Sequence, residues 1–176
     1  MHLSYHQKRL MASLQCLGSK ASFNLHELIN PPSNGLYRCR FVYDAKNYDI
    51  EFHPYAPRKI ASLRLVFDDT LHYPLKYTHR AHLNSLLERR NGCDDVLIVK
   101  NGLLTDTSIA NIALLIDNQW LTPQTPLLQG TTRARLLDEG VLSPAILTPH
   151  HIQDANKIAI MNAMMGFVEI ENGIIT

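Results

Sequence analysis

Residues 94–115 read DDVLIVKNGLLTDTSIANIALL, and this stretch decides the fold of the second half of the chain. Asn101-Gly102 separates two strand-like runs, and this dipeptide favours the left-handed backbone of a two-residue β-hairpin turn. The strand pattern continues through ANIALLID and QWLTP, which turn at Asp117-Asn118. The stretch therefore predicts consecutive antiparallel hairpins.

The first half of the chain combines helical and strand patterns. Leucines at helical spacing predict a helix over residues 4–17, with Ser4 as its cap and Gly18 as its stop. The run GLYRCRFVYDAKNYDIEFHPY alternates with period two on both sides of a polar turn and predicts a β-hairpin. Further elements are expected as a short helix over 24–29, a strand over 62–67 and a helix over 79–90.

Two helices and a last pair of strands are expected after the hairpins. Gly130 and the two threonines after it open a helix that ends at Gly140, and Thr148-Pro149 starts another by cap and first-turn proline. The final run, KIAIMNAMMGFVEIENGIIT, predicts strand, turn and strand. Helices and hairpins followed by a mostly antiparallel half with helices indicate the α+β class.

The composition argues against several classes of function. Of 176 residues, 45% are hydrophobic and the net charge is +1, which suits a compact fold and leaves no electrostatic footprint for nucleic acid or an anionic membrane. The polar start MHLSYHQKRL does not predict a secretory signal. Three dispersed cysteines predict no disulfide framework, and the adjacent histidines 150 and 151 predict no metal site. We expect a cytoplasmic protein.

Four polar features could carry chemistry. Lys76 lies in PLKYTHR just before a predicted helix, where a solvated surface lysine is the simple alternative. Asp106 ends a hairpin strand and could equally be a turn residue. QGTTR at a helix start, where Gly130 frees the backbone and the threonines add hydroxyls, is typical of phosphate sites, although Gly and Thr also cap helices without a ligand. MNAMMG interrupts an apolar strand with a polar turn. Together, an amine, a carboxylate and two places to hold phosphate are the parts that bind pyridoxal phosphate.

The order and spacing of these motifs resemble the class IV aminotransferase family, the fold-type IV pyridoxal-phosphate enzymes. YHQKRL resembles the family's H-x-x-R-L motif, which implies that Arg9 holds the cofactor phosphate. PLKYTHR resembles the segment with the Schiff-base lysine, which falls on Lys76. The hairpin block resembles E-G-S-x-x-N-I-F, with the pyridine partner at Asp106 and its asparagine at Asn111. LLQGTTR and MNAMMG resemble two phosphate-contacting segments, at Thr131 and Thr132 and at Asn162 and Ala163.

The resemblance implies an abbreviated N-terminal α/β lobe over residues 1–70 and a larger pyridoxal-phosphate-binding lobe over 71–176. It further implies a homodimer that acts on a small amino substrate, with Lys76 as general base. The motifs are closest to 4-amino-4-deoxychorismate lyase, which releases pyruvate from its substrate. Branched-chain or D-amino acid transamination is the alternative, with Arg40 as a guessed carboxylate clamp, and a non-catalytic relative is a further one.

Three departures from the family pattern stand out. Asp106 replaces the usual Glu, so its side chain is one methylene shorter. Ala81 stands where aminotransferases of the branched-chain type carry a tyrosine. The chain begins almost at H-x-x-R-L, so the first strands of the family's N-terminal domain have no counterpart in it.

Overall fold

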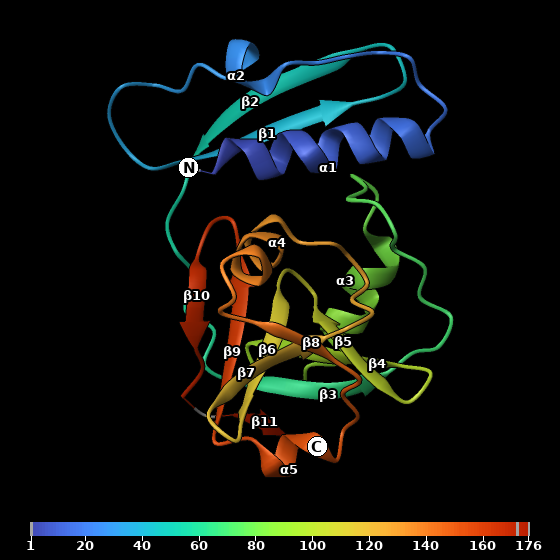
Figure 1. Cartoon of the computed structure of the whole chain (residues 1–176), viewed down its shortest axis with the longest axis vertical. Coiled ribbons are helices and arrows are strands. Elements are labelled where there is room, and N and C mark those ends of the chain that lie inside the picture. Colours follow the sequence, from blue (N-terminus) through green and yellow to red (C-terminus); the bar gives the residue numbers. More distant parts are fainter. Residues whose placement is uncertain (1, 172, 176) are drawn as a thin grey trace. The chain divides into compact units, whose positions relative to one another are not determined.

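A computed structural model describes residues 2–171 and 173–175 of the chain. The chain divides into two compact units, unit 1 (Met1–Arg58) and unit 2 (Lys59–Thr176) (Figure 1). The lobe boundary expected after residue 70 stays a prediction.

Unit 1 packs a helix on one face of a β-hairpin. Its elements are α1 (Leu3–Cys16), α2 (Leu25–Leu28), β1 (Tyr37–Tyr43) and β2 (Tyr48–Pro54). Strands β1 and β2 pair antiparallel, as the alternating pattern predicted. Leu10 and Leu14 of α1 are buried and share an apolar cluster with Phe41 of β1. Burying these side chains is what holds the helix and the hairpin together.

The ends of α1 confirm one expectation and correct another. Gly18 has a φ of 65°, and the amides of Gly18 and Ser19 bond back to the carbonyls of Gln15 and Leu14. This Schellman motif ends the helix at the expected glycine. The predicted cap Ser4 is wrong: the helix begins at Leu3, and His2 precedes it without a capping side-chain hydrogen bond.

Unit 2 contains one mixed sheet with short helices beside it. Its described part has β3 (Leu63–Phe67), α3 (Ala81–Glu88), β4 (Asp95–Lys100), β5 (Leu103–Thr107), β6 (Asn111–Ile116), β7 (Gln119–Pro123), α4 (Thr131–Asp138), β8 (Ser143–Ala145), α5 (His151–Asp154), β9 (Lys157–Asn162), β10 (Gly166–Glu169) and β11 (Ile174–Ile175). The main strand order is β10-β9-β6-β5-β4-β3-β11, with β7 and β8 continuing from β6. Strands β4 to β7 form the predicted antiparallel succession, while β3 pairs parallel with both β4 and β11.

Left-handed residues close the two hairpin turns that were predicted. Asn101 and Gly102 have φ values of 50° and 75° between β4 and β5. Asp117 and Asn118 have φ values of 49° and 61° between β6 and β7. Both turns have positive φ at the two central residues, which matches the twist of the flanking strands.

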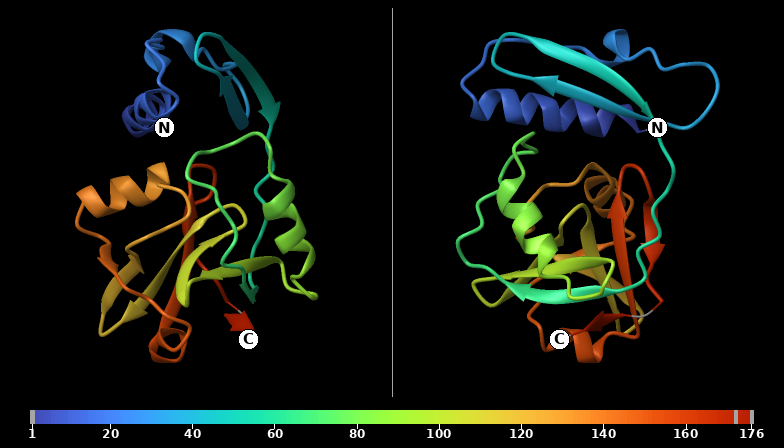
Figure 2. Two further views of the ribbon diagram at one scale, coloured as in Figure 1. Left: turned by 90° about the vertical axis from the view of Figure 1, so that its right-hand side faces the viewer. Right: turned by 180° about the vertical axis from the view of Figure 1, so that it is seen from behind.

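The two faces of the sheet are buried by different partners. Leu97, Leu104 and Ile112 belong to the main apolar core. On the opposite face of β4, Val96 and Ile98 pack against Leu83 and Leu86 of α3. At the other end of the sheet, α4 packs on β6 and β9 through Leu136, Ala113 and Met161. Strands β5 and β6 therefore pass between α3 and α4 (Figure 2).

The last third of unit 2 departs from the prediction in three places. The helix expected from Thr148-Pro149 begins only at His151, because Thr148 makes a turn in which its amide bonds to His151 Nδ1 at 3.0 Å. Strand β8 was not predicted. Strand β11 was not predicted as a separate element, and it pairs parallel with β3, with Ile174 opposite Leu63.

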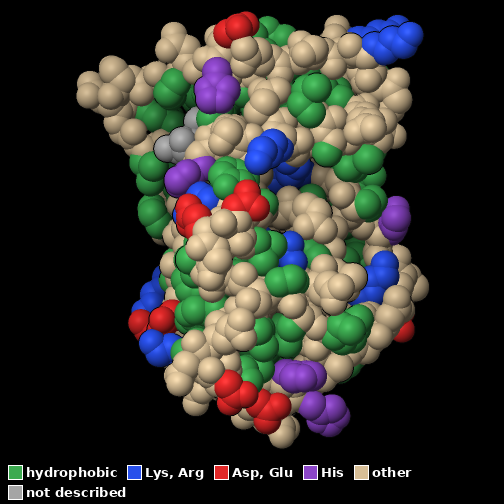
Figure 3. All heavy atoms as spheres, in the orientation of Figure 1, with side chains coloured by type: hydrophobic (Ala, Val, Ile, Leu, Met, Phe, Trp, Pro, Cys, Tyr) green, Lys and Arg blue, Asp and Glu red, His purple; other side chains and the backbone are tan. Residues whose placement is uncertain are grey.

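Charged side chains of both signs are scattered over the face of the molecule shown in Figure 3. Among the described helices, none combines the length and the apolar composition that crossing a bilayer requires.

Candidate functional site

A buried carboxylate at the end of β5 lies at the centre of the candidate site. Asp106 is only 5% exposed. Its Oδ1 accepts a hydrogen bond from Asn111 Nδ2 at 2.8 Å, and its Oδ2 accepts one from the Leu128 amide at 2.8 Å. Asn111 lies directly opposite Asp106 in the β5–β6 pair. The carboxylate thus joins its own hairpin to the segment that leads into α4.

Burial raises the pKa of Asp106 to about 7. Hydrogen bonds from Leu128 and Asn111 and the positive charge of Arg133 oppose this effect, because each favours the ionised form. The acid therefore exchanges a proton near neutral pH. A strongly perturbed acid in such surroundings is a typical property of a functional site.

Gly130 is required for a reason that differs from the one expected. The sequence suggested that glycine frees the backbone, yet Gly130 has φ −70° and ψ 141°, which any residue adopts. A Cβ atom there would lie 1.9 Å from Asn111 Oδ1. Asn111 Nδ2 also donates to the Leu128 carbonyl at 2.9 Å. The first turn of α4 is therefore packed directly against the side chain that holds Asp106.

A second buried charge, Arg133, fixes the same segment from its other end. Its Nη2 donates to the Pro123 carbonyl at 2.7 Å, its Nη1 to Gln129 Oε1 at 3.1 Å and its Nε to Thr122 Oγ1 at 3.3 Å. Residues 123–130 are thus held by Asp106 and Arg133 together. Helix α4 begins as predicted, with Thr131 and Thr132 both buried in its first turn.

Lys76 lies at the centre of a tight turn in an exposed, irregular segment. The Tyr77 amide donates to the Leu75 carbonyl at 3.0 Å, so the turn is a γ-turn with Lys76 in the middle. The Tyr73 hydroxyl donates to the Tyr77 carbonyl at 3.0 Å, and the two rings pack edge to face at 5.6 Å. Lys76 itself is exposed. This arrangement presents the lysine side chain on the outside of a locally braced loop.

Two motifs that are distant in sequence bind the turn at residues 108–110, between β5 and β6. Arg80 Nη2 donates to the Ser108 carbonyl at 2.6 Å. Asn162 Nδ2 donates to the Ile109 carbonyl at 3.3 Å. The structure therefore ties both the Lys76 segment and the end of β9 to the turn that follows Asp106. Arg80, at the start of α3, makes one of these contacts.

Asn162 also shapes the turn that the sequence placed at the phosphate. Its Oδ1 accepts hydrogen bonds from the amides of Met164 and Met165 at 2.8 and 3.0 Å, and Ala163 is exposed in this turn. An asparagine side chain that accepts from the backbone two residues later is a common turn device. A role of Asn162 in shaping this turn is therefore compatible with its predicted place at the cofactor phosphate.

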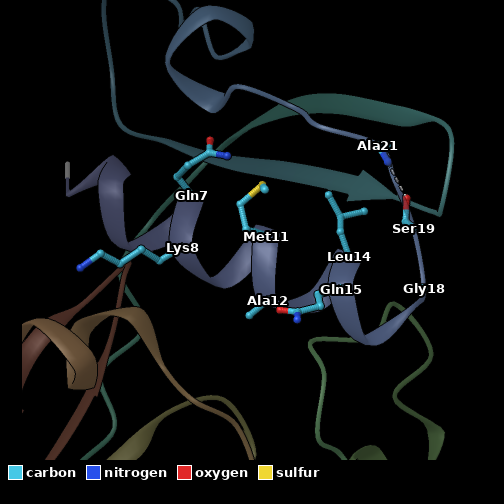
Figure 4. A pocket seen from close by; sticks show the side chains of 9 residues that line it. All are labelled: Gln7, Lys8, Met11, Ala12, Leu14, Gln15, Gly18, Ser19 and Ala21. Carbon is cyan, nitrogen blue, oxygen red and sulfur yellow. Dashed lines mark hydrogen bonds between the residues drawn. The ribbon is translucent and has the colours of Figure 1, made fainter.

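The remaining predicted residues lie in unit 1. Arg9 is on α1, and its assignment to the cofactor phosphate stays a prediction. Arg40 on β1 pairs with Glu51 at 2.9 Å on the exposed surface. A hollow beside α1 is lined by other residues of this unit (Figure 4), which are Gln7, Lys8, Met11, Ala12, Leu14, Gln15, Gly18, Ser19 and Ala21.

Sequence reasoning missed Ser108, Arg80 and Arg133 as parts of the site. Arg133 had a visible signal, because it directly follows the paired threonines at a helix start. Ser108 acts through its backbone, which no residue pattern reveals. Within unit 2, the arrangement offers a primary amine at Lys76, a buried acid with a pKa of about 7 at Asp106, and a helix N-terminus at Thr131.

Comparison with known proteins identifies the family. Residues 1–172 match the family described as amino-transferase class IV. The chain belongs to this family. An uncharacterised protein from Haemophilus influenzae is 37% identical over 171 residues, which are 94% of this chain and 91% of that protein.

Solved structures of the class IV aminotransferase type share the fold. A proposed 4-amino-4-deoxychorismate lyase from Haemophilus somnus has a TM-score of 0.86 and 34% identity, covering 93% of this chain and 89% of that one. A proposed amino-acid aminotransferase from Mesorhizobium loti has a TM-score of 0.84 at 22% identity, covering 99% and 92%. The expected α+β, fold-type IV architecture is confirmed.

Proposed function

We propose that this class IV aminotransferase relative is a pyridoxal-phosphate-dependent enzyme and that its activity is that of a 4-amino-4-deoxychorismate lyase. The observation that carries the proposal is the buried Asp106 carboxyl, fastened to the segment that enters α4 and followed by the turn to which the Lys76 segment is tied. An acid, a helix start and an amine are the groups that this cofactor requires, and unit 2 contains all three.

The chain's residues fit the cofactor by their chemistry. When bound, pyridoxal phosphate would supply an electron sink for the substrate. The Lys76 amine would carry the cofactor, and its Nζ would later accept the proton from the substrate α-carbon. The Asp106 carboxylate would hold the ring nitrogen protonated, because a negative charge beside a pyridinium favours its charged form.

The phosphate would be held by groups from three segments. The first turn of α4 provides backbone N–H groups and the hydroxyls of Thr131 and Thr132. Asn162 and Ala163 belong to the same proposal, as does Arg9 of unit 1. A cytoplasmic homodimer is part of the proposal by family resemblance.

The lyase reaction is favoured over transamination by the relatives and by the sequence around the site. The Haemophilus somnus protein, at 34% identity, is itself a proposed lyase of this kind. Transamination would need a keto acid partner and a carboxylate clamp, and Arg40, the residue considered for the clamp, already pairs with Glu51. The lyase step converts 4-amino-4-deoxychorismate into 4-aminobenzoate and pyruvate, and it needs no keto acid partner.

Absorbance spectra test the cofactor and the lysine together. Wild-type protein mixed with pyridoxal phosphate should develop a visible Schiff-base band that Lys76→Ala lacks. Lys59→Ala is the matched control, because Lys59 is an exposed lysine of the same unit that pairs with Glu171. The absence of a band in the wild type would overturn the proposal.

The two reactions are then separated by their products. Pyruvate released from 4-amino-4-deoxychorismate, followed with lactate dehydrogenase and NADH, would support the lyase. Amino-group transfer from an amino acid to 2-oxoglutarate without pyruvate release from aminodeoxychorismate would replace it by the aminotransferase alternative. A Schiff-base band with neither product would leave a protein that binds cofactor without this chemistry.

A further inference from the structure

Two buried side-chain atoms, one a hydrogen-bond donor and one an acceptor, lack a hydrogen-bond partner in the described part of the chain. They are Nε of Arg80 and Oδ2 of Asp95. Asp95 is 1% exposed, at the first position of β4. A buried polar group without a partner costs free energy, so such atoms indicate a compensating interaction or a function.

Both residues contact the backbone of Ser108, from its two sides. Arg80 Nη2 donates to the Ser108 carbonyl at 2.6 Å. Asp95 Oδ1 accepts from the Ser108 amide at 3.4 Å and from the Val96 amide at 2.8 Å. The amide nitrogen and carbonyl oxygen of one residue are only about 3 Å apart. Arg80 and Asp95 therefore place a guanidinium and a carboxyl on either side of one buried residue.

The neighbouring Asp94 has a different task. Its Oδ2 accepts from the amides of Ala61 and Ser62 and from the Ser62 hydroxyl, at 2.9 to 3.1 Å. Asp94 thus fixes the chain that enters β3. Asp95 takes no part in these bonds, and its Oδ2 has no hydrogen-bond partner in the described part of the chain.

We propose that Arg80 and Asp95 are a pair of positioning residues for Lys76. Arg80 ends the exposed segment 74–79, and its bond to Ser108 fixes that end two residues after Asp106. The Asp95 carboxyl holds the guanidinium in place by charge attraction across Ser108. The pair therefore sets the place of the Lys76 amine relative to Asp106. This role rests on the proposed function, because it matters only if Lys76 carries the cofactor.

The physical need for such an anchor follows from the loop itself. Residues 74–79 form neither helix nor strand, and most of their side chains are exposed. Segments of this kind open locally at low free-energy cost. The γ-turn at Lys76 and the Tyr73–Tyr77 contact shape the loop from within. The bond from Arg80 to the Ser108 carbonyl adds a contact outside the loop, and a contact of this kind fixes the place of the loop on the unit.

The anchor is tested on the cofactor-free protein by limited proteolysis. Chymotrypsin cuts after Tyr77, which is 42% exposed. Arg80→Met should raise the rate of this cut about tenfold, since a charge-assisted hydrogen bond is lost. Arg80→Lys keeps the charge without the planar fork and should give a smaller rise. Arg90→Met is the matched control, because the Arg90 side chain donates to the Leu87 carbonyl three residues earlier, at the end of α3.

Asp95→Asn tests the second member of the pair. It should also raise the cleavage rate, and Arg80→Met/Asp95→Asn should be cut no faster than Arg80→Met alone. Additive effects would overturn the coupling between the two residues. An unchanged rate in both Arg80 variants, with Trp120 fluorescence showing a folded unit, would overturn the anchor.

The link to Lys76 has its own readout. Pyridoxal phosphate is added, the product is trapped with borohydride, and the modified lysine is identified by mass spectrometry. Arg80→Met should slow attachment to Lys76 several-fold, while Arg90→Met leaves it unchanged. Equal rates in wild type and Arg80→Met would overturn the positioning role. Failure of the wild type to be modified at Lys76 would instead overturn the proposed function, and the proteolysis result would stand apart from it.

Discussion

Replacing Gly130 by alanine should destabilise unit 2 far more than a glycine-to-alanine change normally does. The backbone at Gly130 is open to alanine, and alanine would even lower the entropy of the unfolded chain, by about 0.4–1 kcal/mol. The new methyl group, however, would lie 1.9 Å from Asn111 Oδ1. One of the two groups must move, and the asparagine side chain is the one free to rotate.

The cost can be worked out from the bonds that Asn111 would lose. Its Nδ2 donates to Asp106 Oδ1 at 2.8 Å and to the Leu128 carbonyl at 2.9 Å. A hydrogen bond to a charged group contributes about 1.5–3 kcal/mol and a neutral one about 1 kcal/mol. Because alanine is also a poorer helix cap than glycine, the entropy gain is largely offset. The free energy of unfolding should fall by about 2–4 kcal/mol.

Urea unfolding followed by Trp120 fluorescence measures this loss. Trp120 is the single tryptophan of the chain, and its ring packs against Phe167 at 4.9 Å, within unit 2. The midpoint should drop by roughly 1–2 M urea. Asn111→Ala is the matched background, because without the asparagine oxygen there is nothing for the methyl group to meet. The reasoning would be refuted if Gly130→Ala cost less than about 1 kcal/mol, or cost the same with Asn111→Ala present.

Three further predictions concern buried or perturbed charges. Burial raises the pKa of Asp106 from 3.8 to about 7, so between these pH values the native state keeps a proton that the unfolded state releases. The free energy of unfolding should therefore fall as pH rises from about 4 to 7 and level off above. In urea titrations at these pH values, Asp106→Asn should lack this decline. Arg133→Met removes three hydrogen bonds and should lower the free energy of unfolding by about 2–4 kcal/mol. NMR titration of this variant should find the pKa of Asp106 raised further, because a nearby positive charge is lost. Burial alone would raise the pKa of Asp68, but hydrogen bonds, first among them that from His82, lower it to about 2. The ionised carboxylate therefore stabilises the fold above about pH 4, and this stabilisation is lost as pH falls toward 2. In acid unfolding, the stability of His82→Ala should depend less on pH between about 4 and 2.

The hairpins of unit 2 were predictable because their turns are specified locally. Asn101-Gly102 and Asp117-Asn118 need no distant partner to adopt positive φ. The helix after Thr148-Pro149 was misplaced for the opposite reason, since the His151 side chain takes the Thr148 amide and delays the start. Strand β11 has two residues and exists only through β3, so no periodicity could reveal it.

The candidate site was predictable in its residue types but not in its contacts. Lys76 and Asp106 could be named from motif order alone. The bonds that join Asp106 to Leu128, and Arg80 to Ser108, connect positions 22 and 28 residues apart. Two of those partners act through the main chain, which carries no sequence signal. The need for glycine at position 130 likewise depends on a side chain 19 positions earlier, so inspecting the turn alone gave the wrong reason.

The pairing of β11 with β3 affects the order in which the two units can fold during synthesis. Ile174 lies opposite Leu63, and the Leu63 amide bonds to the Gly173 carbonyl at 3.1 Å. This contact joins residues more than a hundred positions apart, which is slow to form during folding. The strand pairing of unit 1, in contrast, lies within Tyr37–Pro54. On the ribosome, unit 1 can therefore complete its packing while unit 2 is still being synthesised, and unit 2 cannot complete its sheet until residues 174 and 175 have left the exit tunnel.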